Sequence, residues 1–555
     1  MPPVLSVAGR IAHDMVIQFY SIISIMPGTM PAYNRQARQP KTPLPAALWL
    51  MPLGGVALSL AFPNEILPGA AGDRPFFLVG WLALIPLLWA TQAWRGRARY
   101  LAAYWYGAGF AVATLSWARL FGYIPWLGLS FAYFAIFFPL ALWLARRMPA
   151  QRLLPCWFAL AYTGLEWLRG QGLFGFAWSE LGFSQIEGFP ARLAAVGGAP
   201  IITLLMLCIV GAAVQTTRDR RPESRRLLAT SLAALAVLGG LGYWQTRQTV
   251  ARWEGAPARQ QIAVVQPSVL RGLTPAALRT TLTAEELDRR LSACLALSRQ
   301  GVASMHADAG PRLVIWPESA LSDPPYQQED IFRFCRDTGS HLLVGAPAFS
   351  SDEHRWRQLN AAYLIGSDVR VPFERYAKMH LVPFGEFVPM RPLVQRFYTV
   401  RAEDMLPGDA RRPLRGAGPP IGVGICFEST FTGIARQYAD QGARLLVFIT
   451  NDAWFHHTAA VRQHFNQARF RALETGLPVA RAASTGISGF IAPDGRILGE
   501  LPIDAADALV RTMPAGTPGT LYTRGGWLVG PICLLLALAL AAYGMLQRRL
   551  LRGVL

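Results

Sequence analysis

The chain has 555 residues, of which 52% are hydrophobic and only 16% are charged, and its mean hydropathy is +0.27. Soluble domains carry about 25% charged residues, so this composition excludes an ordinary soluble globule. The net charge of +19 would suit a nucleic-acid partner if it clustered on one folded surface. The arginines instead lie in short clusters between apolar runs, which is typical of a membrane protein. We therefore expect a bilayer and no nucleic acid as partner.

The N-terminal residues 1–43 are weakly patterned, and we interpret them either as a tail or as residues that precede the true translation start. After them come about eight apolar runs, each near the roughly 20 residues that a membrane-spanning helix needs. The runs lie at 44–62, 75–94, 100–121, 124–145, 153–169, 190–214, 227–246 and 525–546. The sequence therefore predicts a multi-pass membrane domain of seven helices at 44–247, a polar block at 248–522, and a C-terminal transmembrane helix with a cytoplasmic tail at 523–555.

Arginine clusters indicate the orientation of these helices. They follow the second, fourth, sixth and last runs, whereas the alternate loops are poorer in arginine. Positively charged loops remain on the cytoplasmic side, so both termini are expected there. After seven crossings the polar block would lie outside, in the periplasm, and the protein in the inner membrane of a bacterium.

The sequence pattern of the polar block predicts an α/β domain. Short apolar, β-branched runs predict buried strands, and amphipathic patterns predict helices between or after them. The strands are expected at Gln261–Gln266, Leu313–Trp316, His341–Gly345 and Leu445–Thr450, and the helices at 284–299, 430–441 and 459–475. Alternation of this kind indicates strands buried between helical layers.

Cysteine and lysine usage narrows the chemistry. The cysteines show no disulfide framework and no CxxC pair, so the sequence predicts neither a metal site nor a redox centre, and no cofactor is expected. Lysine occurs only as Lys41 and Lys378, although arginine is abundant. A lysine retained deep in such a chain indicates a position that a planar guanidinium does not serve.

Three reactive groups stand at strand ends or in adjoining loops of the block. Glu318 follows Trp316-Pro317, Lys378 lies in a motif that begins at Tyr376, and Cys426 ends the run that starts at Pro420. Singly they could be a helix cap, a surface cation and a core filler. Together they are the groups that acyl transfer through a thioester requires: a base, an oxyanion-stabilising cation and a nucleophile.

These motifs, in this order, resemble those of the nitrilase superfamily, whose Glu-Lys-Cys triad sits on a four-layer αββα sandwich. The long motif from Tyr376 to Glu386, the segment Ile449–Phe455 and the flanking apolar crossings resemble the apolipoprotein N-acyltransferase family more closely. The resemblance implies a phospholipid donor, of which the sn-1 chain of phosphatidylethanolamine is typical, and a diacylated apolipoprotein as acceptor of the chain on its α-amine. It also implies a periplasmic nitrilase-like domain, and we expect a monomer.

The resemblance assigns roles to individual residues. Cys426 would carry the acyl chain as a thioester, Glu318 would be the general base, and Lys378 would stabilise the oxyanion. Glu386 and Glu428 would support the site by orienting Lys378 and balancing charge. His464 and the segment 471–474 are expected to support the structure rather than the chemistry.

Candidate substrate contacts lie around this triad. They are Trp178, Phe387, Met390, Phe427, Asn451 and Trp454. Phe427 stands where the family pattern leads us to expect a tyrosine. The apolar, proline-interrupted segment that runs from Phe387 to Tyr398 is either a mobile arm that gates lipid entry or an ordinary packed loop. Glu166 and Arg169, near membrane depth, are interpreted as a structural pair.

Two other functions are compatible with parts of the pattern. The same triad would serve a membrane-tethered amidase or nitrile hydrolase in which water replaces the amine; the apolar crossings favour a lipid substrate instead. A transporter with an inert outer domain would need ionisable groups in several crossings, and only the fifth run obviously has them.

Overall fold

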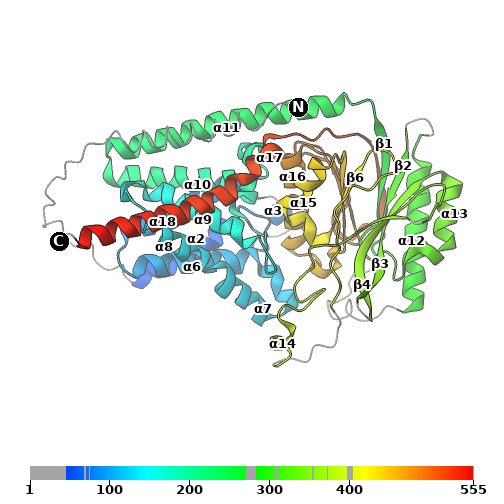
Figure 1. Ribbon diagram of the computed structural model, residues 1–555, viewed down its shortest axis with the longest axis horizontal. Coiled ribbons are helices and arrows are strands. Elements are labelled where there is room, and N and C mark those ends of the chain that lie inside the picture. The colour runs from blue at the N-terminus through cyan, green and yellow to red at the C-terminus, as the bar shows by residue number, and fades with distance from the viewer. Residues whose placement is uncertain are drawn as a thin grey trace. The chain divides into compact units, whose positions relative to one another are not determined.

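The computed structural model describes residues 45–67, 70–73, 75–269, 283–306, 310–352, 355–371, 373–396 and 404–553. The predicted tail at 1–43 lies outside these residues, as does the end of the predicted arm at 397–398. A group of apolar helices precedes an α/β unit in the chain, and a last helix, α18 (Val529–Gly553), follows it (Figure 1).

Each predicted apolar run contains helix. The helices are α2 (Pro45–Ser59), α3 (Ala70–Asp73), α4 (Phe77–Leu82), α5 (Leu84–Ala93), α6 (Ala98–Thr114), α7 (Tyr123–Leu127), α8 (Phe137–Ala145), α9 (Leu154–Arg169), α10 (Ala194–Asp219) and α11 (Pro222–Glu254). Four continuous stretches of the described chain are long and apolar enough to cross a membrane: 123–145, 189–219, 222–254 and 526–551. The described chain therefore has helices that could span a membrane, and the count of about eight crossings stays a prediction.

Glycines allow several of these helices to pack backbone against backbone. A Cβ atom on Gly55 would lie 2.0 Å from Tyr106 O, and Gly109 is equally confined, so α2 and α6 are in close contact. On Gly164 a Cβ would lie 2.4 Å from Leu534 N, where α9 meets α18. Small residues at such contacts are the usual means of helix association in lipid, because apolar side chains gain little from leaving one apolar solvent for another.

The α/β unit contains two sheets. The first has the order β11-β1-β2-β3-β4-β5 and the second β10-β9-β8-β7-β6. The strands are β1 (Arg259–Gln266), β2 (Arg312–Ile315), β3 (His341–Asp352), β4 (Arg355–Ile365), β5 (Glu374–Ala377), β6 (Ile421–Ile425), β7 (Leu445–Thr450), β8 (Val479–Ala483), β9 (Gly489–Ile491), β10 (Ile497–Glu500) and β11 (Asp507–Pro514). The four predicted strands are confirmed as β1, β2, β3 and β7.

Helices cover the outer face of each sheet. α12 (Ala284–Ala303) and α13 (Glu329–Thr338) enclose a core with the first sheet, and α15 (Thr432–Asp440) and α16 (Ala459–Thr475) pack near the second (Figure 1). Two further short helices are α14 (Arg391–Val394) and α17 (Leu521–Arg524). The four layers are an αββα sandwich, which confirms the predicted nitrilase-like fold. β7 and β8 are buried along their length. The sequence of β7 is accordingly a nearly continuous apolar run rather than an alternating one, whereas β8 carries the buried Arg481 in its middle.

The core between the two sheets continues into the helical part. Ile315 of β2 and Val447 of β7 belong to the same buried cluster as Trp117, Phe134 and Trp178, which precede the sandwich in the chain. α11 also continues past the predicted domain boundary at 247 to Glu254, shortly before β1 begins. The sandwich is therefore joined to the helices by a shared apolar core as well as by the chain.

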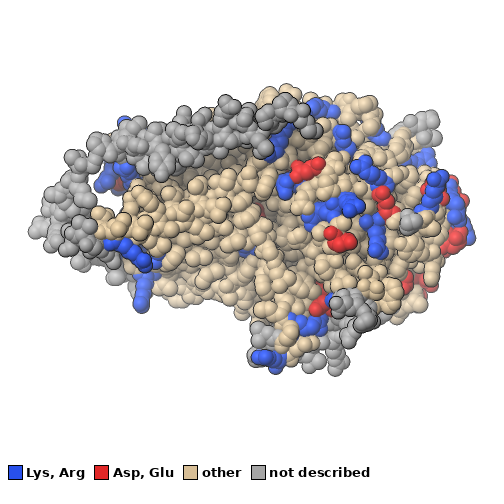
Figure 2. All heavy atoms as spheres, in the orientation of Figure 1, with Lys and Arg blue, Asp and Glu red and all other residues tan. Residues whose placement is uncertain are grey.

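Charge is distributed unevenly between the two parts. On the face shown in Figure 2, the surface over the helices is almost free of charged side chains, whereas acidic and basic groups mix over the α/β unit. α18 also exposes apolar side chains, such as Leu535 at 65% and Leu538 at 47% exposure. An uncharged band of exposed apolar groups is what a helix bundle in hydrocarbon presents.

Candidate active site

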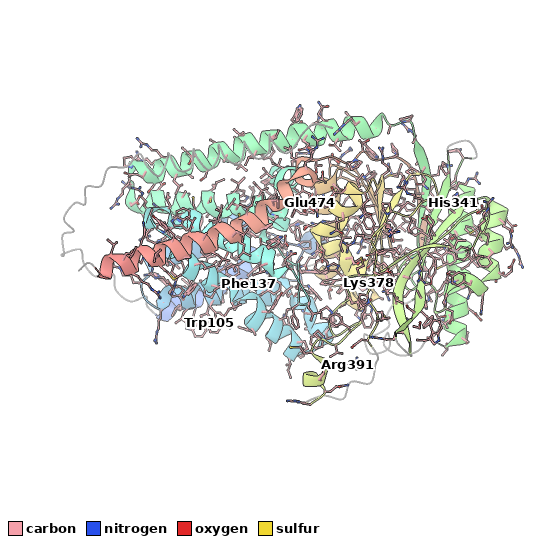
Figure 3. All side chains as sticks on the ribbon, viewed as in Figure 1. Trp105, Phe137, His341, Lys378, Arg391 and Glu474 are labelled. Atoms are coloured by element: carbon pink, nitrogen blue, oxygen red, sulfur yellow. The ribbon has the colours of Figure 1, made fainter. Side chains whose placement is uncertain are left out.

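Three reactive side chains follow the ends of three strands. β2 is followed by Trp316, Pro317 and Glu318, while β5 and β6 end directly before Lys378 and Cys426. Lys378 Nζ lies 3.5 Å from Glu318 Oε1, and Cys426 interacts electrostatically with both groups. Figure 3 shows Lys378 within the α/β unit. The structure thus brings together the three residues that the sequence motifs selected.

Cys426 begins a tight turn, Cys426–Thr430, in a left-handed backbone conformation with φ of 52°. That conformation costs about 1–3 kcal/mol for a residue other than glycine, and it is the strand-to-turn geometry that exposes a nucleophile. Burial and the Glu318 carboxylate raise the pKa of the Cys426 thiol, against the opposing effect of Lys378. The resting group is therefore a neutral thiol, and it needs a base to become a nucleophile.

Glu318 is held as an acceptor. Its Oε1 accepts a hydrogen bond from Asn360 Nδ2 at 2.7 Å, and its Oε2 accepts one from Asn451 N at 2.8 Å. Only 6% of the residue is exposed. Donors on both oxygens fix the orientation of the carboxylate, as a general base beside a thiol requires.

Lys378 is buried between two carboxylates. Its Nζ donates to Glu386 Oε1 at 2.9 Å and lies 3.5 Å from Glu318 Oε1. Burial alone would lower the pKa of Lys378, but Glu386, Glu318 and Cys426 outweigh it and raise that pKa above its usual value. The side chain is therefore an ammonium ion, held where negative charge develops during attack on a carbonyl.

Glu386 orients Lys378 directly, as the resemblance implied. Its Oε1 accepts from both Lys378 Nζ and Asn360 Nδ2 at 2.9 Å, and its Oε2 accepts from Val382 N at 2.8 Å. Asn360 thus bridges two carboxylates with one amide nitrogen. Sequence reasoning missed Asn360, although an asparagine between Leu359 and Ala361 in a buried strand run was an available signal.

Glu428 acts at a different place from the one expected. It is fully buried, and its Oε1 accepts from Tyr376 Oη at 2.7 Å and from Met379 N at 2.9 Å, while its Oε2 accepts from Ile425 N at 2.9 Å. Burial raises the pKa of Glu428, and these hydrogen bonds oppose the rise. Glu428 therefore joins the peptide groups beside Lys378 and Cys426 rather than contacting the ammonium itself.

The candidate substrate contacts fall into two groups. Trp178 is 1% exposed, and its indole nitrogen donates to Gln463 Oε1 at 2.6 Å, so in this conformation it packs inside the protein and offers no surface to a substrate. Asn451 and Phe427 are also buried, at 9% and 7% exposure. Asn451 positions Glu318 through its N–H, and Phe427 packs against Phe176.

The other candidates retain exposed surface. Trp454 and Phe387 are half-buried, and Met390 is 56% exposed. Near Met390 the arm is held by Asp404, which accepts hydrogen bonds from Val388 N at 2.8 Å and from Arg391 Nε at 3.0 Å. Figure 3 places Arg391 beside α14, away from Lys378. These hydrogen bonds fix the first part of the arm, in which Met390 is exposed while Phe387 and Val388 are half-buried.

Glu166 and Arg169 are both buried, at 3% exposure, and each has its own partners. Glu166 accepts from Leu181 N and Thr203 Oγ1, each at 2.8 Å, while Arg169 donates to Trp178 O at 3.0 Å. They hold the loop that follows α9, which agrees with the structural role expected for them.

Two parts of the chain match family models. Residues 54–213 match the N-terminal domain of apolipoprotein N-acyltransferase, and residues 261–517 match the carbon-nitrogen hydrolase family. A protein from Geobacter metallireducens named apolipoprotein N-acyltransferase is 30% identical over 515 residues, which cover 88% of this chain and 94% of that protein. The chain belongs to the apolipoprotein N-acyltransferase family. Another member, from Bradyrhizobium diazoefficiens, is 31% identical over 508 residues and is covered to 92%.

Membership of this family explains why the helices and the sandwich occur in one chain. The two matched segments are the two parts that share a core, and the gap between them falls on α10, α11 and the start of β1. The resemblance drawn from the motifs around Lys378 and Cys426 is thereby confirmed for the chain as a whole.

Proposed function

We propose that this protein transfers an acyl chain from a phospholipid to the N-terminal amine of a diacylglyceryl-cysteine on an apolipoprotein, through a thioester on Cys426. The main support is the cluster of Glu318, Lys378 and Cys426 in a chain that belongs to the apolipoprotein N-acyltransferase family. The protein is then an acyltransferase that acts as a monomer, since all three groups come from one chain.

In the first step Glu318 takes the proton of the Cys426 thiol, and the thiolate attacks an ester carbonyl of the phospholipid. Lys378 holds the oxyanion of the tetrahedral intermediate. When the intermediate collapses, the C–O bond breaks and Glu318 returns the proton to the departing alkoxide of the lysophospholipid. The acyl chain remains on sulfur as a thioester.

In the second step the free α-amine of the lipoprotein attacks the thioester carbonyl, and Glu318 takes a proton from the amine. Lys378 again holds the oxyanion. The C–S bond then breaks, an amide forms, and the proton passes back to the sulfur of Cys426. Acid and base roles thus alternate on one carboxyl group.

The two carboxylates beside Lys378 keep the total charge of the site constant during attack. At rest the ammonium and the carboxylates of Glu318 and Glu386 sum to one negative charge. After proton transfer Glu318 is neutral, and the oxyanion carries the charge that it lost. Charge therefore moves within a buried site and no new net charge has to be created there, which keeps the electrostatic cost of the intermediate low.

Both substrates are lipids, and each methylene taken out of the bilayer would cost about 0.8 kcal/mol. A site that acts on them has to lie at the membrane surface. The uncharged surface of the helices in Figure 2 and the shared core around Trp117 support this placement. We further propose that the helices cross the inner membrane about eight times and that the α/β unit lies in the periplasm, with the arm at Phe387 and Met390 contacting lipid.

The test is the fate of the acyl chain from a radiolabelled phospholipid, incubated with the purified protein and a diacylated lipopeptide. We expect amide-linked label on the lipopeptide and none after Cys426→Ala. The buried Cys335, which lies in the same domain away from the turn, gives the matched control Cys335→Ala, which should transfer normally. Release of free fatty acid with no label on the lipopeptide would instead identify a hydrolase of the amidase type.

A further inference from the structure

α16 is a buried helix that carries several polar side chains. Gln463, His464, Arg471 and Glu474 are each at most 5% exposed. Buried polar groups have to be hydrogen-bonded, so each marks a connection from α16 to a neighbouring element. The connections lead in two directions, toward the catalytic turn and toward the helices of the membrane part (Figure 1).

On one side α16 holds both ends of the turn Cys426–Thr430. His464 Nε2 lies 3.0 Å from Cys426 O and 2.8 Å from Ser429 Oγ. A carbonyl oxygen only accepts, so His464 Nε2 carries a hydrogen and donates. At the other end Arg471 Nη1 donates to Thr430 O at 3.0 Å.

The imidazole of His464 is itself fixed on its other edge and on its face. His464 Nδ1 lies 3.1 Å from Asp452 Oδ1 and 3.0 Å from Arg481 Nη2, and Arg481 Nη2 also donates to Asp452 Oδ2 at 2.9 Å. The ring of Trp178 packs against the imidazole, with 5.5 Å between centroids and an interplanar angle of 31°. The position of Nε2, and through it that of the Cys426 carbonyl, is therefore closely determined.

On the other side, Gln463 binds three segments of the membrane part. Its Oε1 accepts from Trp178 Nε1 at 2.6 Å, and its Nε2 donates to Pro63 O at 2.7 Å and to Thr114 O at 3.1 Å. These partners lie after α2, at the end of α6 and after α9. Because Gln463 and His464 are adjacent, one turn of helix connects three membrane-part segments to the peptide of the nucleophile.

We propose that His464 is a positioning residue for Cys426, and that Gln463 makes this positioning depend on the docked loops of the membrane part. Cys426 has a strained left-handed backbone with φ of 52°, and its carbonyl oxygen is restrained by His464 Nε2 together with Ser429 Oγ, which donates to it at 3.0 Å. The membrane part then does more than anchor the sandwich, because it helps to hold the nucleophile in its reactive geometry. This proposal rests on the function proposed above.

The first test compares two substitutions of His464. His464→Leu removes the donor at similar volume, whereas His464→Gln can place an amide N–H near the Nε2 position. At saturating phospholipid we expect His464→Leu to slow thioester formation by about 10²-fold, the cost of an ångström-scale misplacement of a reacting group. KM should change less than about twofold, and His464→Gln should recover most of the rate.

The second test addresses Gln463 and guards against misfolding of the His464 variants. Gln463→Leu touches no residue of the turn, and we expect it to slow thioester formation by about tenfold with KM unchanged. Arg462, on the same helix, pairs instead with Glu500 at 2.8 Å, so Arg462→Gln is the matched control and should keep the wild-type rate. Detergent-solubilised variants are compared only when their elution and unfolding temperatures match those of the wild type.

A readout that needs no lipid separates this proposal from the function on which it rests. The rate at which iodoacetamide alkylates Cys426 should change in His464→Leu and Gln463→Leu and be unaltered in Arg462→Gln. Wild-type thioester formation and alkylation in both leucine variants would overturn the positioning role. If the wild type forms no thioester but the alkylation differences are found, the proposed function fails while the positioning stands.

Discussion

Asn360 offers the sharpest test of how the buried charges are organised. Its Nδ2 donates to Glu318 Oε1 at 2.7 Å and to Glu386 Oε1 at 2.9 Å, so Asn360→Leu removes two hydrogen bonds to charged groups. Such bonds contribute about 1.5–3 kcal/mol each. Glu318 keeps Asn451 N, and Glu386 keeps Lys378 and Val382 N. Neither carboxylate is left without a donor, so we expect the lower end, about 3 kcal/mol of unfolding free energy.

The effect of Asn360→Leu on rate should exceed its effect on stability at ordinary temperature. Without Asn360 the Glu318 carboxylate keeps Asn451 N on Oε2 but loses its 2.7 Å donor on Oε1, so its orientation is less restrained. A misplaced base costs about 10²-fold in thioester formation. The assay is single-turnover transfer from phospholipid to enzyme, with urea unfolding in parallel. Gln358→Leu, at an exposed position of the same strand, is the control. A variant that is destabilised but forms the thioester at the wild-type rate would show that Asn360 only stabilises the fold.

Three further predictions concern the groups around this cluster. Lys378→Met should lower the rate of single-turnover thioester formation by about 10²–10³-fold, as loss of an oxyanion donor does. Lys378→Arg should be similarly slow, and an active arginine variant would refute the role of a compact ammonium. Tyr376→Phe removes a donor to buried Glu428 and should cost about 1.5–3 kcal/mol in urea unfolding with KM unchanged, so an unaltered unfolding midpoint would contradict it. Burial and Arg411 lower the pKa of His380 to about 4, so the stability of the wild type should fall as pH drops from 6.5 toward 4. In melting curves His380→Phe should lose less stability than the wild type over this interval, and an equal loss would contradict the prediction.

The sign of the His380 prediction follows from linkage. The folded pKa lies below the ordinary value of 6.5, so the unfolded chain binds the proton more readily in this interval. The contribution of neutral His380 is therefore complete above pH 6.5 and is lost as pH falls toward the folded pKa. For Lys378, whose pKa is raised, the opposite holds: its contribution is complete below the ordinary value of 10.5 and is lost only as pH rises beyond it.

Strands, helices and the triad could be predicted because their signals are local. Buried strands such as β7 are nearly continuous apolar runs, and such runs lead to Glu318 and Cys426. Lys378 instead follows the partly exposed strand β5, and its signal is the motif around it and the scarcity of lysine. β2 and β5 belong to the first sheet and β6 to the second. The signals therefore select the three residues, while their meeting depends on how the two sheets pack. The apolar runs of the membrane part carry an equally local signal.

The supporting contacts could not be predicted, because they join positions far apart in the chain. Asn360 lies in the middle of β4 and meets Glu386 only when the following loop folds back over the strand. Trp178 was predicted to contact substrate, yet it is buried, and Gln463, on a helix far along the chain, accepts its N–H. Glu428 was predicted to orient Lys378 and balance charge, but no sequence pattern indicated its four donors, which depend on how two loops pack.

The most direct test of the central claim is the intact mass of the protein after incubation with phospholipid in the absence of acceptor. The account predicts an increase equal to one acyl group, lost on treatment with hydroxylamine and absent from Cys426→Ala. Addition of a diacylated lipopeptide should return the protein to its original mass. An unmodified wild-type protein that nevertheless acylates the lipopeptide, or a Cys426→Ala variant that still gains the acyl group, would contradict a thioester at Cys426.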